Sequence, residues 1–164
     1  MDALKERPLR WHMIGHLQRN KVKQIAEHIS MVETLDSVRL ARELNKVAQK
    51  LRRQIPVLIQ VSLAEEEQKS GVVPEDVESL LTAVREYSSI QVRGFMTMPP
   101  WDPDPERGRP IFRRLRQLRD DMEERLDSAF PELSMGMSND YEIAIQEGSN
   151  MIRIGTAIFG ERKY

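Results

Sequence analysis

The chain has 164 residues, of which 40% are hydrophobic and 31% charged, with a net charge of −1 at pH 7. This length suits one compact domain, and the near-neutral charge gives no field that would favour nucleic acid or an anionic membrane. No cysteine is present, which excludes disulfides and thiolate metal sites, and no apolar run approaches the roughly 20 residues that cross a bilayer. Since the first ten residues are too charged for a signal peptide, a cytoplasmic protein is expected.

Hydrophobic patterns alternate between the period of a strand and that of a helix along the whole chain. Apolar residues recur at i, i+4, i+7 and i+11 between Leu40 and Leu51, after Ser37 at an N-cap position. The polar stretch 64–72 and the proline-rich stretch 99–110 are predicted to be irregular loops. In chain order the predicted elements are a strand at 11–14, a helix at 17–29, a strand at 31–35, a helix at 38–51, a strand at 56–63, a helix at 74–84, a strand at 90–98, a helix at 111–122, a strand at 132–136, a helix at 138–148 and a strand at 150–154.

This alternation predicts an α/β fold with a parallel sheet and helical crossovers, because most of the strands are apolar on both faces. The pattern alone is compatible with a doubly wound sheet or with a barrel. No GxGxxG motif follows a strand, so a dinucleotide-binding fold has no support. Polar residues and glycines instead recur just after several strands, which favours a (β/α) barrel, where such strand ends form the active site.

Two neighbouring strand ends carry groups that suit an anion. Gly155 and Thr156 follow the last strand, and a glycine allows close backbone approach while threonine offers an N–H and a hydroxyl. The same pair is also common in plain turns. Ser138 follows the preceding strand, where it is expected to cap the next helix and can also bind phosphate. Together these residues indicate one shared anion site.

Arg153 lies within the apolar strand at 150–154. Strand alternation places it on the same face as Met151, and a buried guanidinium needs hydrogen-bond acceptors. These acceptors can belong to a salt bridge at the strand end or to a bound ligand. His12 and His16 lie four residues apart, but Gly15 separates them and no supporting motif is present, so no metal site is predicted.

Five segments, taken together, resemble one known family. They are WHMIGHLQRNK (11–21), QKSG (68–71), VRGFMTMPP (92–100), LSMGMSNDYEIAIQEGS (133–149) and MIRIGTAIFGERKY (151–164). The chain closely resembles the pyridoxal-phosphate homeostasis proteins over essentially its whole length. The resemblance implies a single domain over 1–164, a (β/α)8-type barrel like the N-terminal domain of bacterial alanine racemases.

The resemblance also implies a cofactor and its site. Family members bind pyridoxal 5′-phosphate (PLP) at the carboxyl ends of the barrel strands, as monomers. By motif match, Ser138, Gly155 and Thr156 would hold the phosphate, and Arg153 would face the pyridine nitrogen. The family is thought to buffer or deliver the cofactor and has no settled catalytic activity, so no catalytic residue is assigned.

The sequence departs from the family pattern near its start. The family's Schiff-base lysine lies in a motif like AVSK on the first strand, a GEN-type motif follows on the second, and neither occurs here. We therefore expect an N-terminally truncated barrel with six of eight strands, lacking two βα units. Its exposed strand edges would allow self-association. Lys69 is the one lysine considered as a replacement amine, and that role is not favoured.

Three functions follow from these observations. A PLP-binding protein of intracellular cofactor homeostasis, without catalysis, is favoured. A racemase-like PLP enzyme is the alternative, although it needs a lysine anchor and an acid/base partner that Tyr87, Tyr141 and Tyr164 are poorly placed to supply. A fragment that acts only as an interaction module, through Trp101 and the prolines around it, is the third.

Overall fold

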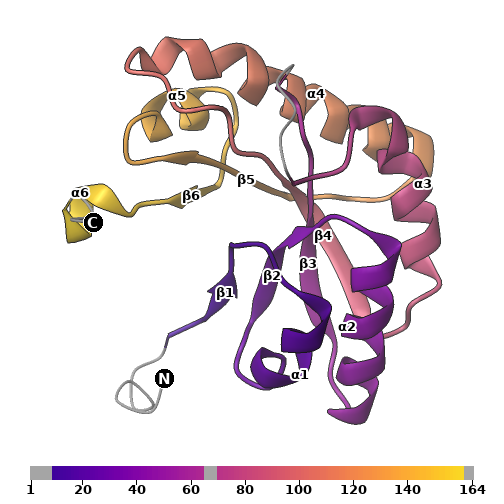
Figure 1. Ribbon diagram of the computed structural model, residues 1–164. Coiled ribbons are helices and arrows are strands. Elements are labelled where there is room, and N and C mark those ends of the chain that lie inside the picture. Colours follow the sequence, from indigo (N-terminus) through magenta and orange to yellow (C-terminus); the bar gives the residue numbers. More distant parts are fainter. Residues whose placement is uncertain (1–8, 65–69, 161–164) are drawn as a thin grey trace.

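The computed structural model describes residues 9–64 and 70–160, in which six parallel strands form one sheet in chain order (Figure 1). The predicted α/β class and the six parallel strands are therefore confirmed. The strands are β1 (His12–Met13), β2 (Met31–Leu35), β3 (Ile55–Gln60), β4 (Ile90–Met96), β5 (Glu132–Met137) and β6 (Met151–Arg153). The α-helices are α1 (Val22–Ile25), α2 (Val38–Lys50), α3 (Pro74–Arg85), α4 (Arg109–Leu126), α5 (Tyr141–Gln146) and α6 (Thr156–Phe159), and the 3-10 helices are η2 (Arg19–Lys21) and η3 (Pro105–Gly108).

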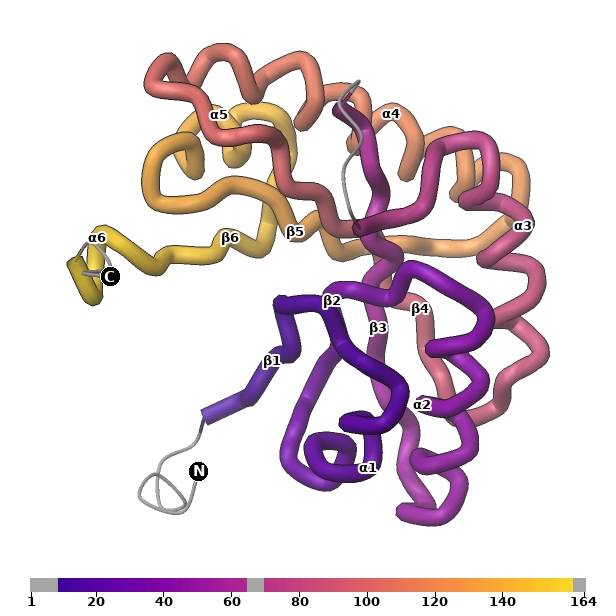
Figure 2. Tube along the Cα trace, in the orientation of Figure 1, coloured from indigo at the N-terminus to yellow at the C-terminus, as the bar shows by residue number. Residues whose placement is uncertain are grey.

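The larger helices cover the outer face of the sheet. Figure 2 shows α2, α3 and α4 following one another around the outside of the strands. Their buried apolar side chains, such as Leu44, Leu81 and Leu115, pack in one core cluster with Val57 and Phe95 of the sheet. This is the arrangement that parallel strands with helical crossovers produce. None of the helices in the described residues combines the length and apolar character needed to cross a membrane.

The sheet is rolled into a half-barrel. Strands β2 and β5 are separated by β3 and β4, so in a flat sheet they would lie about 14 Å apart. Yet Ser134 of β5 donates a hydrogen bond of 2.5 Å to Glu33 of β2. The two side chains therefore meet across the concave face. A small inner cluster of Met31, Leu58 and Met96 lines the same face.

Two predictions of local structure were wrong. The helix expected over 17–29 is only η2 followed by the single turn of α1. The Arg53 guanidinium donates to the carbonyls of Ala26, Glu27 and Ile29. These hydrogen bonds stabilise the turn that ends α1. The stretch 99–110 is not wholly irregular either, because η3 forms within it. Asp104 caps η3 by accepting a hydrogen bond from the Glu106 N–H at 3.1 Å.

Candidate functional site

A cavity of about 750 Å³ opens on the concave face at the carboxyl ends of the strands. It is lined by all four residues that the sequence had singled out for cofactor binding: Ser138, Arg153, Gly155 and Thr156. A second hollow, of about 770 Å³, lies beside η2 and the start of α2 and contains none of these four. The first cavity is therefore the candidate site.

Arg153 reaches across the inner face from the edge strand β6. Its Nη1 donates to the Ser134 hydroxyl at 2.6 Å, and its Nη2 donates to the main-chain carbonyl of Thr97 at 2.9 Å. Burial lowers the pKa of the Arg153 guanidinium, and the negative charges of Glu33 and Asp140 oppose that shift. The predicted need for acceptors is thus met by two groups of the protein, which fix the plane of the guanidinium.

Glu33 and His12 continue this hydrogen-bonded chain to the opposite edge of the sheet. Glu33 is only 2% exposed, accepts the hydroxyl hydrogen of Ser134 at 2.5 Å, and lies 2.8 Å from Nδ1 of His12. His12 and Glu33 both line the cavity. A continuous polar network therefore runs from β1 through β2 and β5 to β6, beside the apolar inner cluster of Met31, Leu58 and Met96.

The prediction that Ser138 caps the following helix is wrong. The N-cap of α5 is Asp140, whose carboxylate accepts a hydrogen bond from the Met137 N–H at 2.6 Å. The Ser138 hydroxyl instead accepts from the N–H groups of Gly155 at 3.1 Å and Ala157 at 3.3 Å. The loops after β5 and β6 are thereby joined, and their donors converge at one place.

Gly155 and Thr156 border open space. A Cβ added at Gly155 would meet nothing within 4 Å, so the backbone is accessible to a ligand there. Both residues are exposed, and Thr156 begins α6. With Ser138 they offer two side-chain hydroxyls beside main-chain N–H groups, a set that suits a phosphate.

The loop after β4 lies at the mouth of the cavity. Trp101 and Asp102 of this loop line the cavity. The Asn139 side chain donates to the Asp102 carbonyl at 2.9 Å. This bond ties the proline-rich loop to the loop that carries Ser138. Trp101 remains 76% exposed. The loop is therefore placed to border a ligand as well as to contact solvent.

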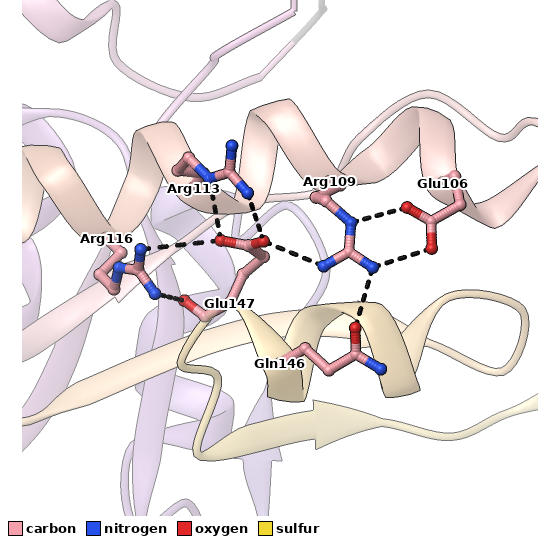
Figure 3. Close-up of polar contacts among 6 residues, drawn as sticks. All are labelled: Glu106, Arg109, Arg113, Arg116, Gln146 and Glu147. Atoms are coloured by element: carbon pink, nitrogen blue, oxygen red, sulfur yellow. Dashed lines mark hydrogen bonds and ion pairs between the residues drawn. The ribbon is translucent and has the colours of Figure 1, made fainter.

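An arginine cluster outside the cavity fixes the segment between Ser138 and Arg153. Glu147, directly after α5, is 5% exposed and accepts hydrogen bonds from Arg109 at 3.0 Å and from Arg113 at 2.9 Å (Figure 3). Arg116 donates to the Glu147 carbonyl at 3.2 Å. These hydrogen bonds, from Arg113 first and then Arg109, lower the pKa of the Glu147 carboxyl. The cluster anchors α5 to α4 and so holds the strand ends on either side of α5.

The described lining of the cavity contains no lysine. Lys69, the replacement amine considered from the sequence, lies outside the described residues.

No group of three or more metal-binding side chains gathers in residues 9–64 and 70–160. His12 and His16 have separate partners, since His16 lies 3.8 Å from Asp36.

Sequence reasoning missed Glu33 and Ser134. A signal for Glu33 was present, because it is a charged residue in the centre of the apolar run 31–35, as Arg153 is in its own strand. Two oppositely charged residues in two apolar strands indicate partners. Ser134 gave no comparable signal, since a serine in a strand is common.

Comparison with known proteins places the chain among PLP-related folds. The family described as "Alanine racemase, N-terminal domain" matches residues 2–163. The pyridoxal phosphate homeostasis protein of Aquifex aeolicus is 47% identical over 99% of this chain and 72% of its own length. That of Pasteurella multocida is 39% identical over 99% of this chain and 70% of its own length.

Solved structures agree with this result. PipY of Synechococcus elongatus, solved with PLP bound, superposes with a TM-score of 0.89 at 32% identity, over 97% of this chain and 74% of that one. An alanine racemase of Clostridium difficile superposes with a TM-score of 0.74 at 15% identity, over 99% of this chain and 43% of that one. The second likeness shows the fold alone.

Proposed function

The chain belongs to the family of pyridoxal phosphate homeostasis proteins, built on the alanine racemase N-terminal domain, and on this premise we propose that it binds PLP in the concave cavity. Its role is to buffer or deliver the cofactor inside the cell, without catalysis of its own. The observation that carries the proposal is the convergence of Ser138, Gly155 and Thr156 with Arg153 in one cavity.

The residues present fit the phosphate end of the cofactor. The hydroxyls of Ser138 and Thr156 supply hydrogen-bond donors, and the open space at Gly155 leaves room beside them. The N–H groups of Gly155 and Ala157 already donate to the Ser138 oxygen, so the hydroxyl hydrogen of Ser138 is left for a ligand. When bound, PLP supplies an aldehyde that reacts with amines. The described cavity offers no lysine for that reaction, so these residues would bind the cofactor non-covalently.

The ring end is where Arg153 would act. Arginine stays protonated and has no acceptor, so against a pyridine nitrogen it can only donate a hydrogen bond. The ring nitrogen then remains unprotonated, and such a ring withdraws electrons poorly. The arrangement suits holding the cofactor more than it suits the carbanion chemistry of a racemase.

An enzymatic role has less support. Neither Tyr87 nor Tyr141 lines the described cavity. Tyr87 packs against the core cluster between the sheet and the helices, and the Tyr141 hydroxyl lies 3.3 Å from the Glu142 carboxylate. No cysteine occurs in the sequence. A racemase-like activity would therefore lack both an amine anchor and a second acid/base among the residues described.

We further propose that the six strands form part of a closed (β/α)8 barrel. The rolled sheet supports this, as does the likeness to the alanine racemase fold. Such a barrel needs two further strands between β1 and β6, which are the outermost strands of the sheet in the described residues.

Cofactor binding is tested by titrating the protein with PLP and following absorbance. Thr156→Val and Ser138→Ala should each weaken binding by about tenfold, because each removes a hydrogen bond to a charged group. Thr82→Val is the matched control, since Thr82 lies on the exposed face of α3 and donates only to the Glu78 carbonyl. Inorganic phosphate should compete with PLP.

Unchanged affinity in both cavity variants would contradict the phosphate assignment. Borohydride reduction followed by mass spectrometry gives a second readout. Without a specific lysine adduct, binding is non-covalent as proposed. A stoichiometric adduct on Lys69 would show instead that a replacement amine anchors the cofactor.

A further inference from the structure

We infer that Glu33 is the positioning residue of the ring end of the cavity, and that it fixes Arg153 through the hydroxyl of Ser134. The inference rests on the proposed function, since it concerns how Arg153 meets the cofactor ring. No motif or resemblance assigned a role to Glu33 or to Ser134.

The burial of Glu33 needs a reason. It is 2% exposed on the same inner face as Met31, Leu58 and Met96, where a carboxylate is costly unless both of its oxygens are satisfied. Both are satisfied here. Oε1 lies 2.8 Å from His12 Nδ1, and Oε2 accepts from Ser134 at 2.5 Å.

The carboxylate determines which way the serine hydroxyl points. A serine has one hydroxyl hydrogen and can donate it in several directions, whereas an ionised carboxylate can only accept. Glu33 therefore takes the hydrogen of Ser134, and the oxygen lone pairs of Ser134 face Arg153. Arg153 Nη1 donates to that oxygen at 2.6 Å. Each hydrogen bond in such a chain strengthens the next.

The same carboxylate sets the charge that a ligand meets. The Glu33 carboxylate lies close enough to Arg153 to compensate its positive charge, and Asp140 adds to this effect. His12 is the other titratable group in contact with Glu33. A guanidinium that already has an anionic partner does not require a second anion from the ligand. The ring end is thus matched to an uncharged acceptor, such as an unprotonated ring nitrogen, rather than to a carboxylate.

A first experiment needs no cofactor. Phenylglyoxal modifies accessible arginines, and peptide mass spectrometry measures its rate at Arg153. We expect Glu33→Ala and Ser134→Ala to speed this modification by a similar factor, and the double variant to speed it no further, because the two residues act in series. Glu33→Gln should retain the slow rate, since its amide oxygen still accepts from Ser134. Glu132→Gln is the control, because this β5 carboxylate pairs with Arg93 outside the cavity.

A second experiment reads the contact with the ring. Affinities are measured for PLP and for its 1-deaza analogue, in which a C–H replaces the ring nitrogen. The wild-type protein should prefer PLP by about tenfold, as expected for one hydrogen bond from a charged donor. The ratio of the two affinities should fall to near one in Glu33→Ala and Ser134→Ala. It should stay near its wild-type value in Glu33→Gln. A purely structural role of Glu33 would not change this ratio.

The outcomes separate the two proposals. If wild-type protein binds neither compound, the proposed function fails, and the phenylglyoxal rates still decide whether Glu33 fixes Arg153. If PLP binds but the Glu33→Ala variant still prefers PLP to the analogue by the wild-type factor, the positioning role of Glu33 is overturned. Unchanged phenylglyoxal rates in both alanine variants, each confirmed as folded by circular dichroism, overturn it as well.

Discussion

Arg153 is held by two acceptors of different kinds, the hydroxyl of Ser134 and the main-chain carbonyl of Thr97. Both lie on neighbouring parts of the inner face, so the planar guanidinium is fixed by two separate N–H groups. A fork of this kind is specific to arginine, because an ammonium group is a compact point charge without a fixed plane.

Arg153→Lys should therefore weaken PLP binding by about tenfold although the charge is kept. The lysine ammonium cannot donate to Ser134, Thr97 and a ligand in the same plane. A PLP titration measures the change. Competition by inorganic phosphate serves as the control, since the phosphate end is intact, and a variant with wild-type PLP affinity would contradict the assignment of Arg153 to the ring.

Gly94 allows β4 and β5 to approach each other. A Cβ at this position would lie 1.8 Å from the Glu132 carbonyl oxygen. Gly94→Ala should therefore lower the free energy of unfolding by about 3 kcal/mol or more, because backbone must move to relieve the overlap. Urea denaturation tests this. Gly155→Ala is the control, with an expected change within about 0.5 kcal/mol, since its Cβ would meet open space.

At the scale of elements, α4 and α5 are joined by charge as well as by apolar contact. Three arginines of α4 surround Glu147, and Arg109 also pairs with Glu106 at 2.6 Å (Figure 3). Because α5 lies between β5 and β6, this cluster holds both strand ends that carry the proposed phosphate donors.

Glu147→Gln should lower the melting temperature at pH 7 by a few degrees. The folded-state pKa of Glu147 lies below its ordinary value near 4.5, so the folded protein binds this proton less readily than the unfolded chain. Its contribution to stability is present above that ordinary pKa and is lost as the pH falls through the folded value.

Wild-type protein should therefore lose more stability than Glu147→Gln between about pH 5 and about pH 3. Thermal unfolding across this range, followed by circular dichroism, measures the difference. Glu142→Gln, on the exposed face of α5, is the matched control and should follow the wild type. Parallel curves for wild type and Glu147→Gln would contradict the stabilising role of the cluster.

The periodicities of the sequence predicted most of these elements, because a helix or strand buried on one face repeats its apolar residues at a fixed interval. The errors arose where a distant residue decides local structure. Arg53 ends the helix expected over 17–29, and no local pattern near that helix contains Arg53. Likewise Ser138 and Asp140 are both residues that favour an N-cap, and only the folded loops determine that Asp140 takes the N-cap position of α5.

The site could be predicted only in part for the same reason. The residues proposed to bind the phosphate follow strand ends and match a family motif, so sequence alone brought Ser138, Gly155 and Thr156 together. The Glu33–Ser134 contact depends on how far the sheet rolls, which no spacing along the chain expresses.

At the scale of the whole molecule, the described sheet has two free edges. β1 pairs only with β2, and β6 pairs only with β5, in residues 9–64 and 70–160. Exposed apolar side chains lie near both edges, with Ile14 46% and Ile152 36% exposed and Phe159 of α6 85% exposed. Unpaired edges with apolar neighbours favour pairing with another chain.

Light scattering should therefore show self-association that rises with protein concentration. Ile152→Lys should reduce it, because a charge beside an edge strand opposes pairing. Leu51→Lys is the matched control, since Leu51 is 38% exposed and lies after α2, away from both edges. A single monomeric species at every concentration would contradict this prediction.

The order of the strands also bears on how the protein folds. Each strand pairs with the one before it in the chain, so every βα unit can add to a structure that is already formed, at little cost in loop closure. The Glu33–Ser134 bond is different, because it joins residues 101 positions apart and requires β2 to β5 to be in place. The network that holds Arg153 is therefore expected to form at the end of folding, so that a partly folded chain would have most of its sheet and no ligand site.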